Sequence, residues 1–352
     1  MADLMSQVTR AIMSFSLLAL VLVSDANAGG ARRLDPKALV TPNPSAEAAR
    51  LMSQLVDNYG HKTLAAQEEF DLANDEVTFI GRLTGHLPAI KSFDLGFYSP
   101  VSTWQDGVPD RIMEWGVSAK GIISLSWHWL APSGGVSFET SKTTFDVSKA
   151  VRPGTKEYNL VVRDIDAISV LLEKFRDARL PILWRPLHEA NGGWFWWGAH
   201  GSAPFKKLYR MMFERMTKVH HLNNLIWVWS TAVPLSIEWY PGDHYVDIVG
   251  ADMYNRAGDH SPNAQLFHDM NSKFDGRKML AYSESGSLPD PRRMFAEHAP
   301  WAWVNNWGGA FATGGADNSL DVIRQFYADS HVVTLDRLAV PAGSAKETPA
   351  LH

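Results

Sequence analysis

Short apolar runs alternate with segments of helical spacing along most of this chain. From about residue 60 onward, each run is followed by a polar loop and then by an amphipathic stretch. Alternating strands and helices build parallel βαβ units, so the pattern predicts an α/β protein. The predicted strands are residues 76–81 or 92–98, 121–129, 181–187, 225–230, 246–253, 278–283 and 301–306, with a weaker candidate at 63–67.

Helical spacing is clearest in three segments. Residues 46–59 carry apolar positions three and four apart, and residues 165–178 and 204–220 do the same. The second segment places these residues on or near one predicted face: Ile165, Val170, Leu171, Leu172 and Phe175. The chain has no short repeat of solenoid type, and its glycine pairs after residue 307 do not form a phosphate-binding GxGxxG loop.

The ends of the chain differ from this repeated part. Residues 1–28 resemble a secretory signal, because the apolar stretch 11–23 is short for a membrane span and Ala26–Asn27–Ala28 forms a small-x-small cleavage site. A membrane anchor is the alternative. We expect a flexible lead-in over residues 29–45, a catalytic domain over 46–335 and a loose tail over 336–352.

Composition narrows the classes of function. The formal net charge of the 352 residues is −5, which argues against nucleic acid as the main partner. No basic run indicates membrane binding once the signal is removed, and no feature indicates an obligate partner, so we expect a secreted monomer, extracellular or periplasmic. The chain contains no cysteine, which excludes disulfides and cysteine-based metal sites.

Two glutamates each follow a predicted strand. Glu189 comes just after the run 181–187, and Glu284 comes just after the run 278–283. If both strands belong to one barrel, both acids lie at its carboxyl rim. Two carboxyl groups facing one cleft are what glycosidic bond cleavage requires, one protonated and the other ionised. The residues alone do not assign these two roles.

The histidines give weaker signals. The sequence HEANG at 188–192 lacks the second histidine of the zinc-protease pattern HExxH, so we expect neither a metal nor a cofactor. His128 ends a predicted strand and is either structural or in contact with a ligand. His220 and His221 end a helical segment, where a structural role is expected. Ser285 lacks the GxSxG context of a serine hydrolase.

Tryptophan is unusually dense, with 14 in the chain. Flat indole faces can stack on sugar rings, but alternate tryptophans on a strand also pack into cores. We expect Trp194 to line a cleft and leave Trp196 and Trp197 open between cleft wall and packing. The remaining tryptophans of the two dense segments are Trp301, Trp303 and Trp307.

With these residues in place, the chain resembles glycoside hydrolase family 26, known best for endo-β-1,4-mannanases. The resemblance is strongest over WRPLHEANGGWFWWG (184–198). It is supported, in the family's order, by SWHW (126–129), VGADMY (249–254), AYSESG (281–286) and WAWVNNWGG (301–309). It covers about residues 60–330.

The resemblance implies a (β/α)8 TIM barrel in a single catalytic domain and a retaining double displacement. Glu189 matches the general acid/base and Glu284 the nucleophile. It further implies roles around the substrate for His128, His188 and Trp194, a hydrogen bond from Tyr254 to the nucleophile with support from Asp252, and a sugar platform from Trp307, with Trp303 as the second choice.

The expected activity is therefore hydrolysis of mannan, glucomannan or galactomannan, with β-mannan polysaccharides or manno-oligosaccharides as ligands. A β-1,3-xylanase or mixed-linkage β-glucanase of the same family is the first alternative, and a non-catalytic carbohydrate-binding barrel is the second. Retention predicts that the two carboxyl groups lie about 5–5.5 Å apart. The long polar stretch 131–158 is expected to shape distal sugar subsites.

Overall fold

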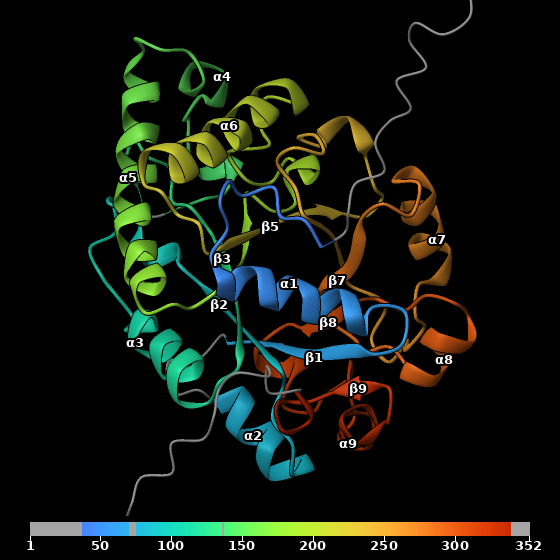
Figure 1. Ribbon diagram of the computed structural model, residues 1–352. Helices are drawn as coiled ribbons and strands as arrows, with labels where there is room; N and C mark the ends of the chain where they lie inside the picture. The colour runs from blue at the N-terminus through green and yellow to red at the C-terminus, as the bar shows by residue number, and fades with distance from the viewer. Residues whose placement is uncertain (1–36, 70–74, 136, 339–352) are drawn as a thin grey trace, which may run out of the picture. The chain divides into compact units, whose positions relative to one another are not determined.

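A closed barrel of eight parallel strands forms the centre of the protein (Figure 1). The computed structural model describes residues 37–69, 75–135 and 137–338. The strands follow one another around the ring in chain order, and pairing of β1 with both β8 and β2 closes it. This confirms the predicted (β/α)8 barrel. The strands are β1 Thr63–Glu68, β2 Ile90–Asp94, β3 Ile122–Trp127, β4 Ile182–Pro186, β5 Leu225–Ala232, β6 Ile248–Met253, β7 Met279–Ser285 and β8 Trp303–Asn306.

Helices follow the strands around the outside, and a two-residue strand, β9 (Val332–Val333), pairs with β1. Of the two alternatives for one early strand, 92–98 overlaps β2, and 76–81 is wrong, because these residues lie in a helix whose apolar positions Val77 and Ile80 are buried in the core. Val170 is 55% exposed and does not share the buried face of its helix. The helices are α1 Ala46–Asn58, α2 Asp75–Thr84, α3 Val108–Met113, α4 Val147–Ala150, α5 Lys156–Asp177, α6 Ser202–Glu214, α7 Ala264–Lys273, α8 Pro291–Ala296 and α9 Leu320–Ala328.

The inside of the barrel changes from apolar to polar along its axis. At the amino end of the strands, inward side chains such as Leu64 and Ile90 pack with α1, which crosses this end of the barrel in Figure 1. Toward the carboxyl ends, the inward positions of the same strands are occupied by Glu68, Ser92 and Asp94. The polar groups are thus concentrated at the end where barrel enzymes bind their substrates.

Part of the expected lead-in is packed against the barrel. The Val40 N–H donates to Asp247 at 2.7 Å, and the buried Thr41 hydroxyl donates to the Leu225 carbonyl at 2.7 Å. Flexibility was therefore the wrong expectation for residues 37–45. Residues 336–338 are also anchored, through hydrogen bonds from Arg337. The predicted signal and most of the predicted tail lie outside the described residues. Within the described ranges, every helix is too short or too polar to traverse a bilayer.

Candidate active site

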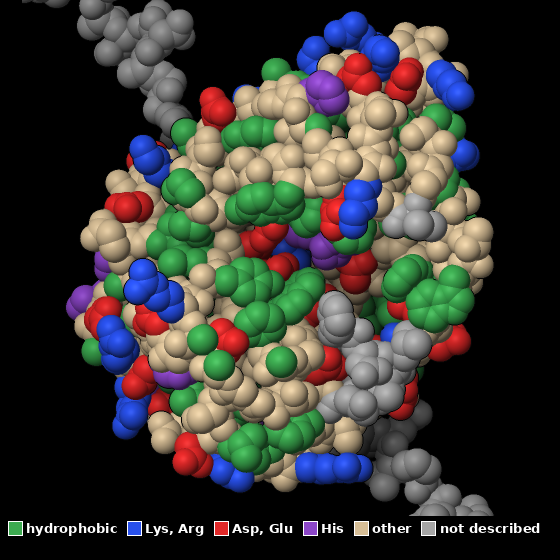
Figure 2. Space-filling model, turned by 180° about the vertical axis from the view of Figure 1, so that it is seen from behind, with side chains coloured by type: hydrophobic (Ala, Val, Ile, Leu, Met, Phe, Trp, Pro, Cys, Tyr) green, Lys and Arg blue, Asp and Glu red, His purple; other side chains and the backbone are tan. Residues whose placement is uncertain are grey.

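The carboxyl end of the barrel is hollowed, and acidic and histidine side chains lie at the bottom of the hollow (Figure 2). Glu189 follows β4, Asp252 lies near the end of β6 and Glu284 lies near the end of β7. One carboxylate oxygen from each lies within 4.8 Å of the other two. The closed ring of strands thus brings together two glutamates that are 95 residues apart (284 − 189) in the sequence.

The backbone after β4 has an unusual local geometry. Leu187 has φ 54° and Glu189 has φ 53°, both in the left-handed region that non-glycine residues seldom adopt. A Cβ atom on Gly198 would lie 2.1 Å from the Ala190 carbonyl oxygen, so this position requires glycine. Strain of this kind persists only where surrounding contacts fix it, and it is common at functional sites.

Glu189 has the environment of a carboxyl group that stays protonated near neutral pH. Its side chain is mostly buried, and one oxygen accepts a 2.9 Å hydrogen bond from Trp194 Nε1. Burial raises the pKa of Glu189, and the negative charges of Asp252 and Glu284 raise it further, to about 8. Such a group can donate a proton to a departing oxygen.

Glu284 has the opposite environment, surrounded by donors. Arg185 Nη2 donates to its Oε2 at 2.9 Å, and the Tyr254 hydroxyl donates to its Oε1 at 2.5 Å. A register shift between β6 and β7 at this point places Asp252 opposite Glu284 and leaves Ser283 as an extra residue. Because such a bulge changes which side a residue faces, both Ser283 and Glu284 can point inward. The donors hold both oxygens of Glu284 in place.

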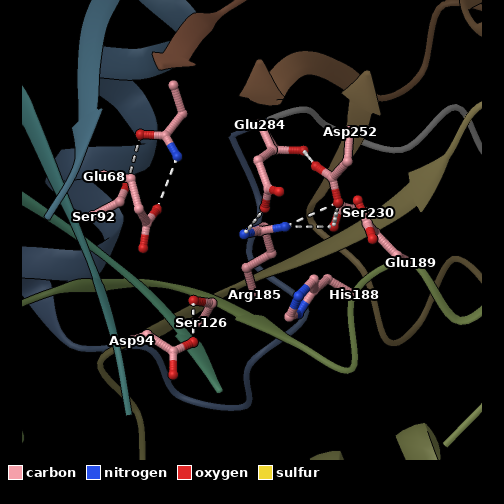
Figure 3. Close-up of polar contacts among 12 residues, drawn as sticks. Glu68, Ser92, Asp94, Ser126, Arg185, His188, Glu189, Ser230, Asp252 and Glu284 are labelled. Carbon is pink, nitrogen blue, oxygen red and sulfur yellow. Dashed lines mark hydrogen bonds and ion pairs between the residues drawn. The ribbon is translucent and has the colours of Figure 1, made fainter. Parts of the chain in front are cut away.

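Arg185 lies on the barrel interior between two acids (Figure 3). Its Nη1 donates to Asp252 Oδ2 at 2.9 Å and to Ser230 at 3.1 Å. Burial raises the pKa of Asp252, Arg185 opposes this, and the net value is about 6. The Asp252 side chain is fully buried and also accepts from Ser283 at 2.6 Å. Asp252 therefore holds Arg185, which in turn contacts Glu284, and its expected supporting role around the nucleophile stays a prediction.

The three carboxyl groups also resemble a set of metal ligands. Arg185 already contacts two of them, Asp252 and Glu284, and supplies the positive charge that a cation would bring. The trio is therefore better matched to acid–base chemistry than to metal binding.

Two histidines lie side by side at the same rim. His188 Nε2 lies 3.1 Å from His128 Nε2, and His128 Nδ1 lies 2.7 Å from Asp94 Oδ2. Burial and the positive charges of His128 and Arg185 hold the pKa of His188 well below its ordinary value. Both histidines therefore lie at the carboxyl rim, and their expected roles around the substrate stay a prediction.

The tryptophans separate into cleft and core. Trp194 is 46% exposed, whereas Trp196 and Trp197 are fully buried, each donating its indole N–H to a backbone carbonyl. Trp307 lies beside His128, with ring centroids 6.4 Å apart. Trp303 packs in the apolar interior with α1, so the alternative of Trp303 as a sugar platform is wrong. The cause is its place at the amino end of β8, far from the rim.

Comparison with known proteins agrees with this geometry. The model of glycosyl hydrolase family 26 matches residues 40–337. The chain belongs to glycosyl hydrolase family 26. Over 315 residues it is 39% identical to a mannan endo-1,4-beta-mannosidase of Thermothelomyces thermophilus, covering 86% of this chain and 63% of that protein. It covers 54% and 51% of mannan endo-1,4-beta-mannosidases B and A of Piromyces sp, so the chain spans between half and two thirds of these curated relatives.

Solved structures of the family superpose closely. The Podospora anserina GH26-CBM35 β-(1,4)-mannanase has a TM-score of 0.81 at 36% identity, covering 87% of this chain and 69% of that one. A β-mannanase from a symbiotic protist of the termite Reticulitermes speratus, complexed with gluco-manno-oligosaccharide, also has a TM-score of 0.81, at 34% identity, covering 86% and 98%.

Sequence reasoning missed several polar residues of this family 26 site. Arg185, Asp94 and Glu68 all lie at inward positions near the carboxyl ends of their strands. Glu68 is buried and accepts a 3.0 Å hydrogen bond from Asn305, which accepts in turn from Ser92 (Figure 3). Strand alternation was the available signal, because a charged residue in phase with inward apolar residues must lie inside the barrel.

Proposed function

We propose that this protein is a secreted, retaining endo-β-1,4-mannanase that acts on mannan, glucomannan or galactomannan. One observation carries the proposal: Glu189 and Glu284 approach within 4.8 Å at their nearest oxygens and have opposite environments. Oxygens this close support the carboxyl separation of about 5–5.5 Å typical of retaining enzymes over the 6.5–9.5 Å of inverting ones. Relatives named mannan endo-1,4-beta-mannosidases support the choice of mannan.

The reaction takes two steps. Glu284 attacks the anomeric carbon while Glu189 transfers its proton to the glycosidic oxygen, so the glycosidic bond breaks and a glycosyl ester forms on Glu284. Glu189, now a carboxylate, then takes a proton from water, whose oxygen attacks the anomeric carbon and releases Glu284. The contacts from Arg185 and Tyr254 restrain Glu284 for in-line attack and stabilise the carboxylate that leaves in the second step.

The surroundings of the two acids suit a sugar chain. Trp194 offers a half-exposed indole face beside the acid, and Trp307 offers a second near His128. Gly192 leaves room for the Trp194 ring, since a Cβ atom there would lie 2.2 Å from it. In the stretch 131–158, which also contains α4 and the start of α5, Thr140 hydrogen-bonds the backbone of the Trp194 segment, so the part before α4 can extend the binding surface. Apolar platforms bind the ring faces, while polar groups choose the hydroxyl orientation.

Secretion and a monomeric state belong to the same proposal. The signal-like residues 1–28 support export, and the mild net charge of −5 agrees with a neutral polysaccharide as partner. N-terminal sequencing of the protein from the culture medium tests cleavage after Ala28. Light scattering tests the monomer.

The deciding experiment is hydrolysis of purified polysaccharides by the full chain. We expect cleavage of mannan and glucomannan with retention of anomeric configuration, read by proton NMR of the first product. Cutting of β-1,3-xylan or lichenan without mannan would replace the proposed substrate. Glu284→Ala should be inactive; a wild-type protein equally inert but able to bind mannan would be a carbohydrate-binding barrel. Full activity in a chelator is expected, and its loss would indicate a metal-dependent hydrolase.

A further inference from the structure

A chain of three polar side chains runs from β2 to the catalytic loop. Asp94 ends β2, His128 follows β3 and His188 follows β4. Asp94 Oδ2 lies 2.7 Å from His128 Nδ1, and His128 Nε2 lies 3.1 Å from His188 Nε2. The last residue of this chain directly precedes the proposed acid, Glu189.

Asp94 is surrounded by hydrogen-bond donors. Its carboxylate accepts from the backbone N–H of Gly96 at 2.6 Å, from the Ser126 hydroxyl at 2.7 Å and from the backbone N–H of His128 at 3.1 Å, in addition to the His128 ring. A carboxylate with this many donors is ionised, and a carboxylate 2.7 Å from an imidazole nitrogen favours the charged imidazolium. Arg185 is already paired with Asp252 and Glu284, so His128 is the cation in contact with Asp94.

The two histidines have only one consistent arrangement of protons once His128 is charged. Two facing Nε2 atoms at 3.1 Å need one donor and one acceptor. An imidazolium at His128 has protons on both nitrogens, so it donates one to Asp94 and one to His188. His188 then accepts at Nε2 and carries its own proton on Nδ1, a buried nitrogen that has no hydrogen-bond partner among the described residues. Within the described part of the chain no carboxylate contacts the His188 ring, so its neutral form is favoured.

We propose that Asp94 is a positioning residue that holds His128 as an imidazolium and thereby fixes His188 as the neutral tautomer protonated on Nδ1. The alternative is a neutral His128, with its proton on Nδ1 toward Asp94. His188 would then have to donate from Nε2, and the Asp94 carboxylate, whose side chain is 27% exposed, would accept from a neutral ring.

The charges around the pair agree with this assignment. Burial lowers the pKa of His128, but the charge and hydrogen bond of Asp94 outweigh burial and raise it; Glu284 adds to the rise and Arg185 opposes it. Burial alone would raise the pKa of Asp94. The charge and hydrogen bond of His128 and the hydrogen bond of Ser126 outweigh burial and lower this pKa to about 2. The rings of Phe138, Phe195 and Trp307 also lie near His128, with centroids 4.8, 5.5 and 6.4 Å from its own, in tilted or edge-on contacts.

The consequence for catalysis rests on the proposed function. The imidazolium fixes the His188 ring on one side, and the Trp197 indole fixes the His188 carbonyl on the other by a 2.8 Å hydrogen bond. Glu189 follows at once with a left-handed backbone, so its carboxyl position depends on the orientation of His188. Asp94 thus acts on the acid through two histidines.

Nitrogen-15 NMR of the histidine side chains tests the assignment without any activity measurement. The chain has 13 histidines, so His128→Gln and His188→Gln are used only to identify the two rings. At about pH 7.5, where a free histidine is mostly neutral, we expect wild-type His128 to be protonated on both nitrogens and His188 on Nδ1 alone. A neutral His128, or a His188 protonated on Nε2, would overturn the proposal, and this holds even if the substrate is not mannan.

Asp94→Asn then tests the role of the carboxylate. We expect His128 to become neutral at the same pH, and kcat to fall by about 10- to 100-fold with a smaller change in KM, as for loss of a hydrogen bond to a charged group. The matched control is Asp166→Asn, which removes a carboxylate paired with His220 among the outer helices. It should leave His128 charged and kcat unchanged. If His128 in Asp94→Asn stays charged, or if both variants lose activity equally, Asp94 does not have this role.

Discussion

Arg185 and Glu284 are joined at 2.9 Å inside the barrel, and the other end of the same guanidinium is held by Asp252 at 2.9 Å. The arginine is nearly fully buried, so its fork geometry fixes the nucleophile relative to β4 and β6. A rigid nucleophile is what in-line attack at an anomeric carbon requires.

Arg185→Lys should therefore lower kcat/KM on mannan by about 10- to 100-fold, because an ammonium group cannot bridge both acids. Arg185→Met should also destabilise the fold by about 3–5 kcal/mol, since it leaves buried carboxylates without a cation. Steady-state kinetics and urea unfolding measure these effects. The control is Arg210→Lys on α6, where the arginine donates to the Pro241 carbonyl. It should change neither kcat/KM nor the free energy of unfolding. Normal kinetics in Arg185→Lys would contradict the assigned role.

Tyr254→Phe removes the 2.5 Å hydrogen bond to Glu284 and keeps the ring. We expect kcat to fall by about 10- to 100-fold with little change in unfolding free energy, because the side chain is half-exposed. Tyr240→Phe is matched to it, since Tyr240 donates to Asp243 outside the cleft. An equal loss in both variants would indicate a general effect of removing a tyrosine hydroxyl.

The pH profile should report Glu189. Its raised pKa of about 8 means that the proton needed in the first step is present below that pH and lost above it. The kcat/KM value should therefore decline as pH rises through about 8. The Trp194 hydrogen bond lowers the pKa of Glu189, so Trp194→Phe should move this limb to higher pH. Glu189→Gln should abolish this decline of kcat/KM at high pH. If the decline persists in Glu189→Gln, it belongs to another group.

Glu68 should make stability depend on pH. Burial is the main cause that raises its pKa, from an ordinary 4.5 to about 8, although Arg185 opposes the rise. Between these values the folded protein binds a proton that the unfolded chain has lost, so stability falls as pH rises through this window. Glu68→Gln keeps the acceptor for Asn305. Relative to wild type, its free energy of unfolding should rise by more than about 1 kcal/mol when the pH is changed from 5 to 8.

Urea unfolding at both pH values measures the effect of Glu68→Gln. The control is Glu47→Gln on α1, because hydrogen bonds from its own backbone and from Arg179 outweigh burial and lower the pKa of Glu47. The effect of Glu47→Gln on the free energy of unfolding should be equal at pH 5 and pH 8. If the Glu68→Gln gain is also equal at pH 5 and 8, Glu68 is not protonated in the folded protein.

The sequence by itself determined the repeated strand–helix order, the two glutamates after separate strands and the exposed Trp194 loop. These follow from local signals, because strand alternation, loop composition and the run PILWRPLHEANGGWFWWG are readable without knowing any long-range contact. The same local signals failed at residues 76–81, where a short apolar run fits a helix and a strand equally well.

Only the tertiary structure decided what surrounds the two acids. Ring closure brings Asp94, Arg185 and Glu68 to one polar layer from three different strands, and the bulge at Ser283 of β7 turns Glu284 inward. Burial and neighbouring charge, which no local pattern encodes, then separate a protonated Glu189 from a Glu284 held by donors. Position along β8 likewise decided the surroundings of two tryptophans. Trp303 begins the strand and packs in the core, whereas Trp307 follows the last residue of the strand and lies at the rim beside His128.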